Sequence, residues 1–121
     1  MHYSESSEIK TVQLIAGTEI VPLTTGVTIE AGAGILPAGS VLGRNETTGK
    51  CRLVDSASTG GSEKPLFVLP QEVDASSEDV FATAYKTGIF IRDALKFGGS
   101  DTAETHEAAL RLLNIHMRQN Y

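Results

Sequence analysis

The sequence predicts a small single domain of mixed α/β class, mainly β, built of short strands and hairpins with one helix near the C-terminus. Three observations support this: many short β-branched runs, frequent glycine turns among the 12 Gly, and a single segment with helical spacing. The 121 residues correspond to one domain. We expect an extended N-terminal arm over residues 1–30 and a compact domain over residues 31–121.

The first thirty residues contain few anchors for a core. Residues 1–10 are rich in Ser, Glu and Lys, which favours a mobile chain end. Residues 11–30 hold short β-branched runs interrupted by Gly17, Pro22 and Gly26, a pattern typical of extended segments and loops. Pro22 restricts such a run to an edge or irregular strand.

The middle of the chain predicts hairpins. Residues 37–39 (PAG) indicate a turn, and a strand begins at Val41 and Leu42. A turn at residues 45–49 brings residues 50–55 back as its partner, and residues 56–64 form a polar loop. We then expect an apolar strand over residues 65–73 interrupted by Pro70, an acidic turn at 74–79, a strand at 80–86 and a turn at Thr87 and Gly88. Residues 93–97 could form one helical turn.

Residues 100–113 predict the helix. Asp101 stands where an N-cap belongs and Glu104 follows at the spacing of a capping box. An apolar-leaning stripe recurs at steps of three or four residues; its members are Ala103, His106, Leu110 and Leu113. Asn114 is a plausible left-handed stop, after which residues 115–117 can resume as a strand.

Composition excludes several classes of function. The net charge is −5 and Lys and Arg are scattered, so we expect no direct nucleic-acid partner. No apolar run approaches the roughly 18 residues of a membrane span, and the polar, acidic start lacks the features of a secretory signal. We therefore expect no membrane partner and a cytoplasm-like compartment during synthesis.

No residue pattern predicts a catalytic or metal site. The glycines at 32, 34 and 39 do not have the dinucleotide-binding spacing, and His2, His106 and His116 do not have zinc-helix spacing. His106 is expected on the helix surface and His116 at a strand edge. Cys51, the single cysteine, lies in a strand-like run and reads as a small buried hydrophobe. The acidic pairs Glu72/Asp74 and Glu78/Asp79 are expected in solvated turns, so we predict neither an enzyme nor a cofactor.

The order of short motifs resembles the bacteriophage head decoration protein family, the lambda-type proteins that bind the outside of capsids. The resemblance covers about two thirds of the chain and lies in the segments GSVLGRNETTGK (39–50), TGGS (59–62), PLFVL (65–69), EVDASSEDV (72–80), YKTGIF (85–90) and LRLLNI (110–115). The chain departs from the family pattern at three places. Gly60-Gly61 stands for Asp-Gly, Phe67-Val68 for Gly-Ile, and Asn114 for Gly.

The resemblance implies a fold and a role. The fold would be a β-tulip-like barrel, and the protein would be a structural homotrimer on the outside of the expanded phage head. At threefold or quasi-threefold sites it would bridge neighbouring major capsid proteins and stabilise the shell against packaged DNA. The arm would bind the capsid, with Ile9, Val12, Leu14 and Ile15 as candidate contacts. The location would be the virion, with the host cytoplasm during assembly.

Two alternatives from other classes stay open. A small-ligand or carbohydrate-binding β module displayed on a virion would need a platform of two or more exposed aromatic side chains. An enzyme would need a reactive Cys51 or His106. A buried, inert Cys51 would remove the first half of that second alternative.

Overall fold

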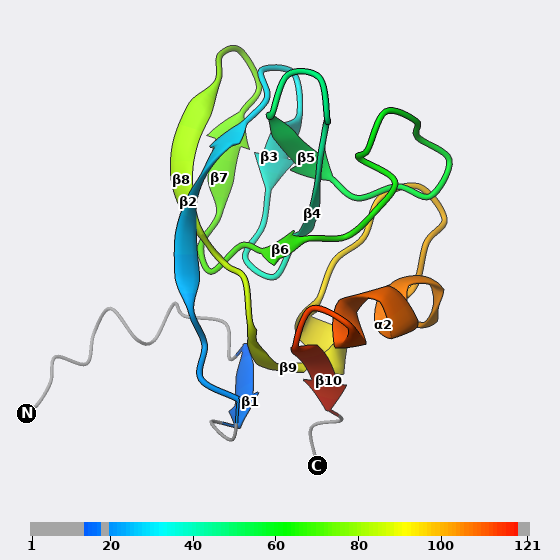
Figure 1. Cartoon of the computed structure of the whole chain (residues 1–121). Coiled ribbons are helices and arrows are strands. Elements are labelled where there is room, and N and C mark those ends of the chain that lie inside the picture. The colour runs from blue at the N-terminus through cyan, green and yellow to red at the C-terminus, as the bar shows by residue number, and fades with distance from the viewer. Residues whose placement is uncertain (1–13, 18–19, 119–121) are drawn as a thin grey trace, which may run out of the picture.

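The computed structural model describes residues 14–17 and 20–118, and these form ten strands, one α-helix and one 3₁₀ turn. Five strands close into a barrel in the order β2-β5-β4-β6-β8 (Figure 1). Their bounds are Thr24–Ile29 for β2, Cys51–Leu53 for β5, Val41–Arg44 for β4, Phe67–Val68 for β6 and Val80–Tyr85 for β8. The predicted class, mainly β with one C-terminal helix and a small barrel, is confirmed.

A three-stranded sheet lies below the barrel in Figure 1. Its central strand is β9 (Gly88–Ile91), with β1 (Ile15–Gly17) antiparallel on one side and β10 (Ile115–Arg118) parallel on the other. The helix α2 (Ala103–Arg111) leads into β10, and the 3₁₀ turn η1 (Arg92–Ala94) follows β9. A separate antiparallel pair joins β3 (Gly34–Leu36) to β7 (Val73–Ala75).

Strands β4 and β6 form a wall shared by two apolar clusters. Side chains alternate between the faces of a strand. Accordingly the paired residues Leu42 and Phe67 belong to the cluster inside the barrel, whereas their neighbours Val41 and Val68, also paired, belong to the cluster under the three-stranded sheet and α2. All four side chains are buried. The barrel and the sheet with its helix are therefore packed as one body.

The hairpin of β4 and β5 follows its sequence. The Asn45 side-chain oxygen accepts hydrogen bonds from the amides of Thr47 (2.8 Å) and Thr48 (3.0 Å), which folds the turn locally. Gly49 has φ 75°, a conformation that glycine adopts without strain. Gly43 has a different role, since a Cβ there would overlap the Ser62 carbonyl oxygen of the crossing loop. The predicted turn, returning strand and loop are confirmed.

The helix begins later than predicted. The expected bounds were residues 100–113 with Asp101 as the N-cap, but α2 spans Ala103–Arg111 and Thr102 is its N-cap. The Thr105 hydroxyl accepts a hydrogen bond from the Thr102 amide at 3.0 Å. The Asp101 carboxylate is bonded elsewhere, which removes it from the cap. Asn114 ends the helix segment at φ 62°, and a strand follows at Ile115, as predicted.

Several predicted segments differ in extent. The apolar run at residues 65–73 forms only the two-residue β6 before the chain turns at Pro70, and the expected turn at 74–79 begins inside β7. The expected helical turn lies at Arg92–Ala94 rather than at 93–97. Within the stretch 1–30 expected as an arm, β1 pairs with β9 and β2 is a wall of the barrel. Pro22 lies just before β2, outside the ladder that its missing amide would interrupt.

Candidate functional site

The three-stranded sheet carries both ends of the described chain. Leu14 precedes β1 and Arg118 ends β10, and these two strands flank β9 on opposite edges. In Figure 1 this sheet is at the lower end of the molecule, whereas the β4–β5 hairpin is at the upper end. We call the surface formed by β1, β9, β10 and the adjoining residues Val21 and Leu23 the chain-end face.

Val21 and Leu23 place exposed apolar side chains at this face. They are 63% and 49% exposed. The Thr87 hydroxyl donates to the Val21 carbonyl at 2.6 Å and accepts from the Leu23 amide at 3.0 Å, and the Lys86 amide donates to the Leu23 carbonyl at 2.8 Å. The segment is thereby fixed to the turn that precedes β9. An exposed apolar pair on a fixed backbone suits a contact with another protein.

The four predicted contact residues fall into two groups. Ile9 and Val12 lie outside the described residues. Leu14 is 6% exposed and belongs to the apolar cluster under the sheet, and its carbonyl accepts a hydrogen bond from the Ile91 amide at 2.8 Å. Ile15 is half-buried and pairs with Phe90. The two predicted contacts that are described therefore join β1 and the residue before it to β9.

A buried polar cluster joins α2 to the loop after β5. The Nε2 atom of His106 lies 2.7 Å from Oδ2 of Asp101, and the Asp101 carboxylate also accepts hydrogen bonds from the Ser56 amide (2.7 Å) and hydroxyl (2.6 Å). The side chains of His106 and Asp101 are 5% and 4% exposed. The Ser56 hydroxyl and then His106 hold the pKa of Asp101 below its usual value. The His106 ring also stacks on Phe97, with 5.6 Å between ring centroids.

This cluster does not have the order of a catalytic triad. In a triad the histidine lies between the serine and the carboxylate, so that it can take the serine proton. Here the carboxylate lies between the other two, and the Ser56 hydroxyl donates to Asp101 instead of to the histidine. The prediction that His106 lies on the helix surface was wrong, because Asp101 and Phe97 cover it. Its place in the apolar stripe of α2 was the signal for burial.

Cys51 is a core residue, as the sequence predicted. It is 1% exposed and belongs to the cluster inside the barrel. Burial raises the pKa of its thiol to about 11, and nearby Arg44 only partly opposes this. A thiol with this pKa is almost wholly protonated at neutral pH and is a poor nucleophile.

The remaining candidate groups are exposed or dispersed. The carboxylates of Glu72, Asp74, Glu78 and Asp79 lie at the surface, and Asp79 pairs with Lys50 at 2.7 Å. Among the residues described, no three His, Cys, Asp or Glu side chains gather as metal ligands would. No helix in the described part of the chain has the length and apolar character to cross a membrane.

The described aromatic residues do not form a platform. Phe67 and Phe90 are buried, Tyr85 and Phe97 are half-buried, and Phe81 is the one aromatic side chain in residues 14–17 and 20–118 that is largely exposed, at 77%. The condition set for a carbohydrate-binding module was two or more clustered, solvent-facing aromatics. That condition is not met in the described residues.

The fold and surfaces define a small β-barrel protein with exposed apolar side chains and without a catalytic arrangement among the residues described. The sequence profile of the bacteriophage lambda head decoration protein D family matches residues 12–117, which is most of the chain. The chain therefore belongs to the head decoration protein family, and it is a structural protein of the bacteriophage virion. A comparison with curated proteins gives no match.

The family match extends beyond the segments that suggested it. The motif resemblance covered residues 39–97 and the end of α2, whereas the match begins at residue 12. It includes Val12, Leu14 and Ile15 and excludes Ile9. The family accounts for a role in decorating the capsid and for a location on the virion.

Proposed function

We propose that the protein binds as a homotrimer to the outer surface of the expanded phage head, at threefold or quasi-threefold sites, and stabilises the shell against packaged DNA. The observation that supports this most is the family match over residues 12–117, which spans nearly all of the described fold. The partners in this proposal are the major capsid protein and two further copies of the chain, and no step is chemical.

The chain-end face is the proposed contact with the shell. It carries both ends of the described chain and the exposed side chains of Val21 and Leu23. Leu14, the first residue described, lies at this face, and Ile9 and Val12 are five and two positions before it in the sequence. We propose Ile9, Val12 and Ile15 as contact residues and Leu14 as the anchor that holds the base of the arm to the core.

Binding to a lattice explains why individual contacts can be weak. A trimer that touches several capsid subunits forms its second and third contacts at a high effective concentration, so that avidity exceeds the affinity of each contact. Ordering an extended segment costs conformational entropy. Tight binding then requires all sites at the correct spacing, which favours the expanded lattice over the unexpanded one.

Co-sedimentation with heads of the phage that encodes the protein tests the proposal. We expect saturable binding to expanded heads, little binding to unexpanded heads, and electron-microscopic density at threefold positions. Decorated heads should release DNA at a higher temperature than bare ones. Failure of the wild-type protein to co-sediment with expanded heads would overturn the proposal.

Variants of the chain-end face locate the contact. The double variant Val21→Asp/Leu23→Asp should bind expanded heads at least tenfold more weakly. Ile35→Asp is the matched control, because Ile35 is 60% exposed and lies on β3, away from this face. A shortened chain that begins at residue 14 should keep its fold and lose most of its head binding. Equal loss in the control would show that the face is wrongly assigned.

A further inference from the structure

Strand β8 has an open edge on the outside of the barrel. It pairs with β2 along its full length, from Val80 to Tyr85, but with β6 only through Tyr85. The Lys86 amide donates to the Leu23 carbonyl just before β2. In an antiparallel ladder every second residue directs its N–H and C=O groups toward the same neighbouring strand, so Ala84 and Ala82 also direct theirs toward β2. Thr83 and Phe81 turn theirs the other way, where no described strand pairs with them.

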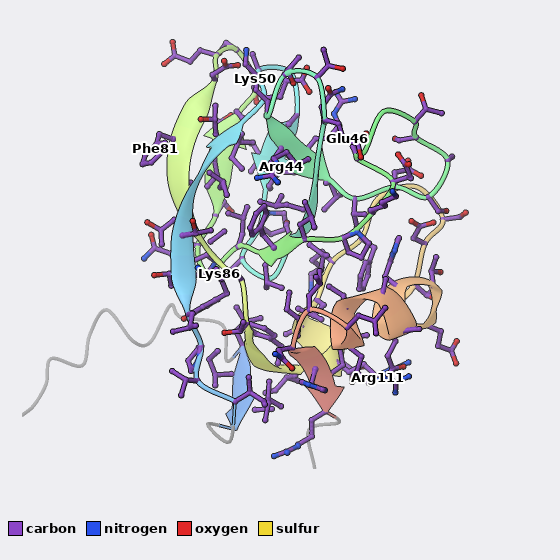
Figure 2. The ribbon with its side chains drawn as sticks, in the orientation of Figure 1. Arg44, Glu46, Lys50, Phe81, Lys86 and Arg111 are labelled. Carbon is purple, nitrogen blue, oxygen red and sulfur yellow. The ribbon has the colours of Figure 1, made fainter. Side chains whose placement is uncertain are left out.

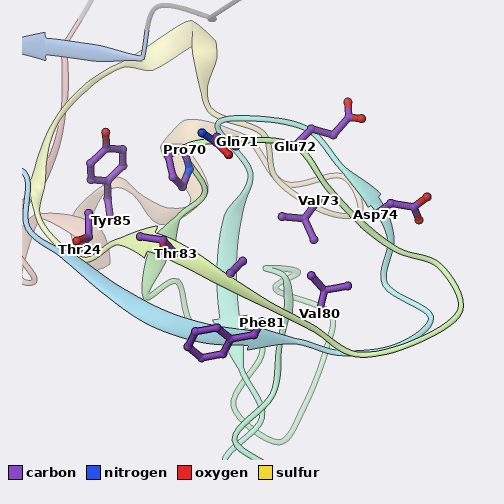
Figure 3. A pocket seen from close by; sticks show the side chains of 11 residues that line it. Thr24, Pro70, Gln71, Glu72, Val73, Asp74, Val80, Phe81, Thr83 and Tyr85 are labelled. Atoms are coloured by element: carbon purple, nitrogen blue, oxygen red, sulfur yellow. The ribbon is translucent and has the colours of Figure 1, made fainter.

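A groove runs along this edge. It has a volume of about 660 Å³ and lies between β8 and residues 70–74, the last two of which belong to β7 (Figure 3). Phe81 is among its lining residues and is 77% exposed. The ring lies over Gly26 of β2, where an added Cβ would come within 2.5 Å of the ring Cζ. Exposed aromatic side chains and open strand edges are features that native proteins usually cover.

The rim of the groove is acidic. Glu72 and Asp74 line it, and no lysine, arginine or histidine is among its lining residues. The Ser76 hydroxyl and then its amide donate to the Asp74 carboxylate and lower the pKa of that group, so it is ionised at neutral pH. A ligand for this groove needs an apolar side chain for Phe81 and a cation for the rim.

The chain itself carries such a combination at the end of α2. Leu112 is 87% exposed, the highest value among the exposed large apolar residues described. Arg111, directly before it, is exposed and is not in any of the ion pairs found between described residues. Figure 2 shows Phe81 at the upper left of the molecule and Arg111 at the lower right, so one molecule presents the two features on different sides.

We propose that the Phe81 groove of one copy receives Leu112 and Arg111 of the next copy. Leucine would cover the aromatic ring, and the guanidinium would lie at the carboxylates of Glu72 and Asp74, where paired charges fix the register. A contact between two different patches is heterologous, and such contacts close into a ring when the rotation allows. Phe81 lies toward the β4–β5 end of the molecule and Arg111 toward the chain-end face, so this contact is separate from the trimer contact of a head-bound protein and does not rest on the proposed function.

Disulfide trapping tests the contact directly. Phe81→Cys and Leu112→Cys are made separately and mixed under mild oxidation, with Cys51 left in place because it is buried. We expect the mixture to form an intermolecular disulfide at least tenfold faster than either variant alone. The control pairs Leu112→Cys with Glu46→Cys on the β4–β5 hairpin, exposed and away from the groove. A rate no higher than this control, or faster trapping of Phe81→Cys with itself, would overturn the proposal.

Charge reversal supplies a second readout. Each of Glu72→Arg and Arg111→Glu should slow the trapping, and the chain that carries both should recover most of the rate, because the pair is restored across the contact. Absence of recovery would contradict the predicted register. Head binding is measured in parallel with the wild-type protein. Normal head binding without trapping rejects only the self-contact, whereas trapping without head binding rejects only the proposed function.

Discussion

Asp101 is the residue through which α2 is held to the loop after β5. Its carboxylate accepts two hydrogen bonds from Ser56 and contacts His106, and the side chains of Asp101 and His106 are little exposed to solvent. Asp101→Asn should lower the free energy of unfolding by about 1–3 kcal/mol, because an amide nitrogen replaces one acceptor in a buried cluster. Urea unfolding measures this. Glu78→Gln, at an exposed position, is the control and should change stability by less than about 0.5 kcal/mol.

The same carboxylate should contribute to acid stability. Its pKa is lowered in the folded protein, so its contribution is present above the pKa of the unfolded chain and is lost as the pH falls through the folded pKa. The wild-type protein should therefore lose more stability than Asp101→Asn when the pH is lowered below about 4, the usual pKa of an aspartate. Parallel stability curves for the two proteins would contradict this.

Cys51 should be inert in the folded protein. Burial and a pKa of about 11 leave little thiolate and no access for a reagent. A thiol-reactive dye at pH 8 should label less than a tenth of the native chains in an hour and one thiol per chain after unfolding in urea. Rapid labelling of the native protein would reopen a role for this thiol.

Single residues show where sequence reasoning succeeds and where it does not. Cys51 was placed correctly because its neighbours make an apolar run. His106 was misplaced because it was expected at the surface of the helix, although its place in the apolar stripe of α2 turns it toward the core. Phe81 is exposed because β8 alternates so that the small side chain of Ala84 faces inward and the ring faces out. Hydrophobicity alone does not decide which face of such a strand is buried.

At the scale of elements, local chemistry set most of the boundaries. The β4–β5 hairpin follows from Asn45 and Gly49, which fold the turn without distant partners. The N-cap of α2 was predicted at Asp101, one residue before the observed N-cap Thr102. The spacing of Asp101 and Glu104 also occurs in Thr102 and Thr105, and only the tertiary bonds of Asp101 decide between the two.

Asn114 tests the link between α2 and β10. Its φ of 62° lies in the left-handed region, where a β-branched side chain is strained. Asn114→Val should lower the free energy of unfolding by about 1–2 kcal/mol. Asn114→Gly should leave it within about 0.5 kcal/mol, because glycine loses the strain and gains freedom in the unfolded chain. Equal stability of the valine and glycine variants in urea would contradict a steric cause.

At the scale of the whole molecule, the pairing of distant strands was beyond the sequence. Strands β2 and β8 join residues more than fifty positions apart, and β10 pairs with β9 in parallel across α2. Local patterns predict that strands exist but not which edges meet. The candidate site also depends on contacts between residues far apart in the sequence. Residues 11–30 were expected to hold extended segments and loops, whereas the fixing of Val21 and Leu23 by Thr87 depends on a contact across the fold.

The shared wall of β4 and β6 predicts that the barrel and the chain-end sheet unfold together. Leu110 of α2 is fully buried in the same cluster as Val41 of β4 and Val68 of β6, and these two strands belong to the barrel. Leu110→Ala should lower the free energy of unfolding by about 2–5 kcal/mol.

Hydrogen exchange should show the lower stability of Leu110→Ala both in the barrel and in the three-stranded sheet. The amides compared are Ile91, bonded to Leu14 in the sheet region, and Glu30, bonded to Cys51 at the barrel. Ile35→Ala, at an exposed position on β3, is the control and should change neither amide by more than about 0.5 kcal/mol. If protection falls at Ile91 but not at Glu30, the barrel folds independently of the chain-end face. An equal loss of protection at both amides would mean that the barrel and the chain-end sheet unfold as one cooperative unit.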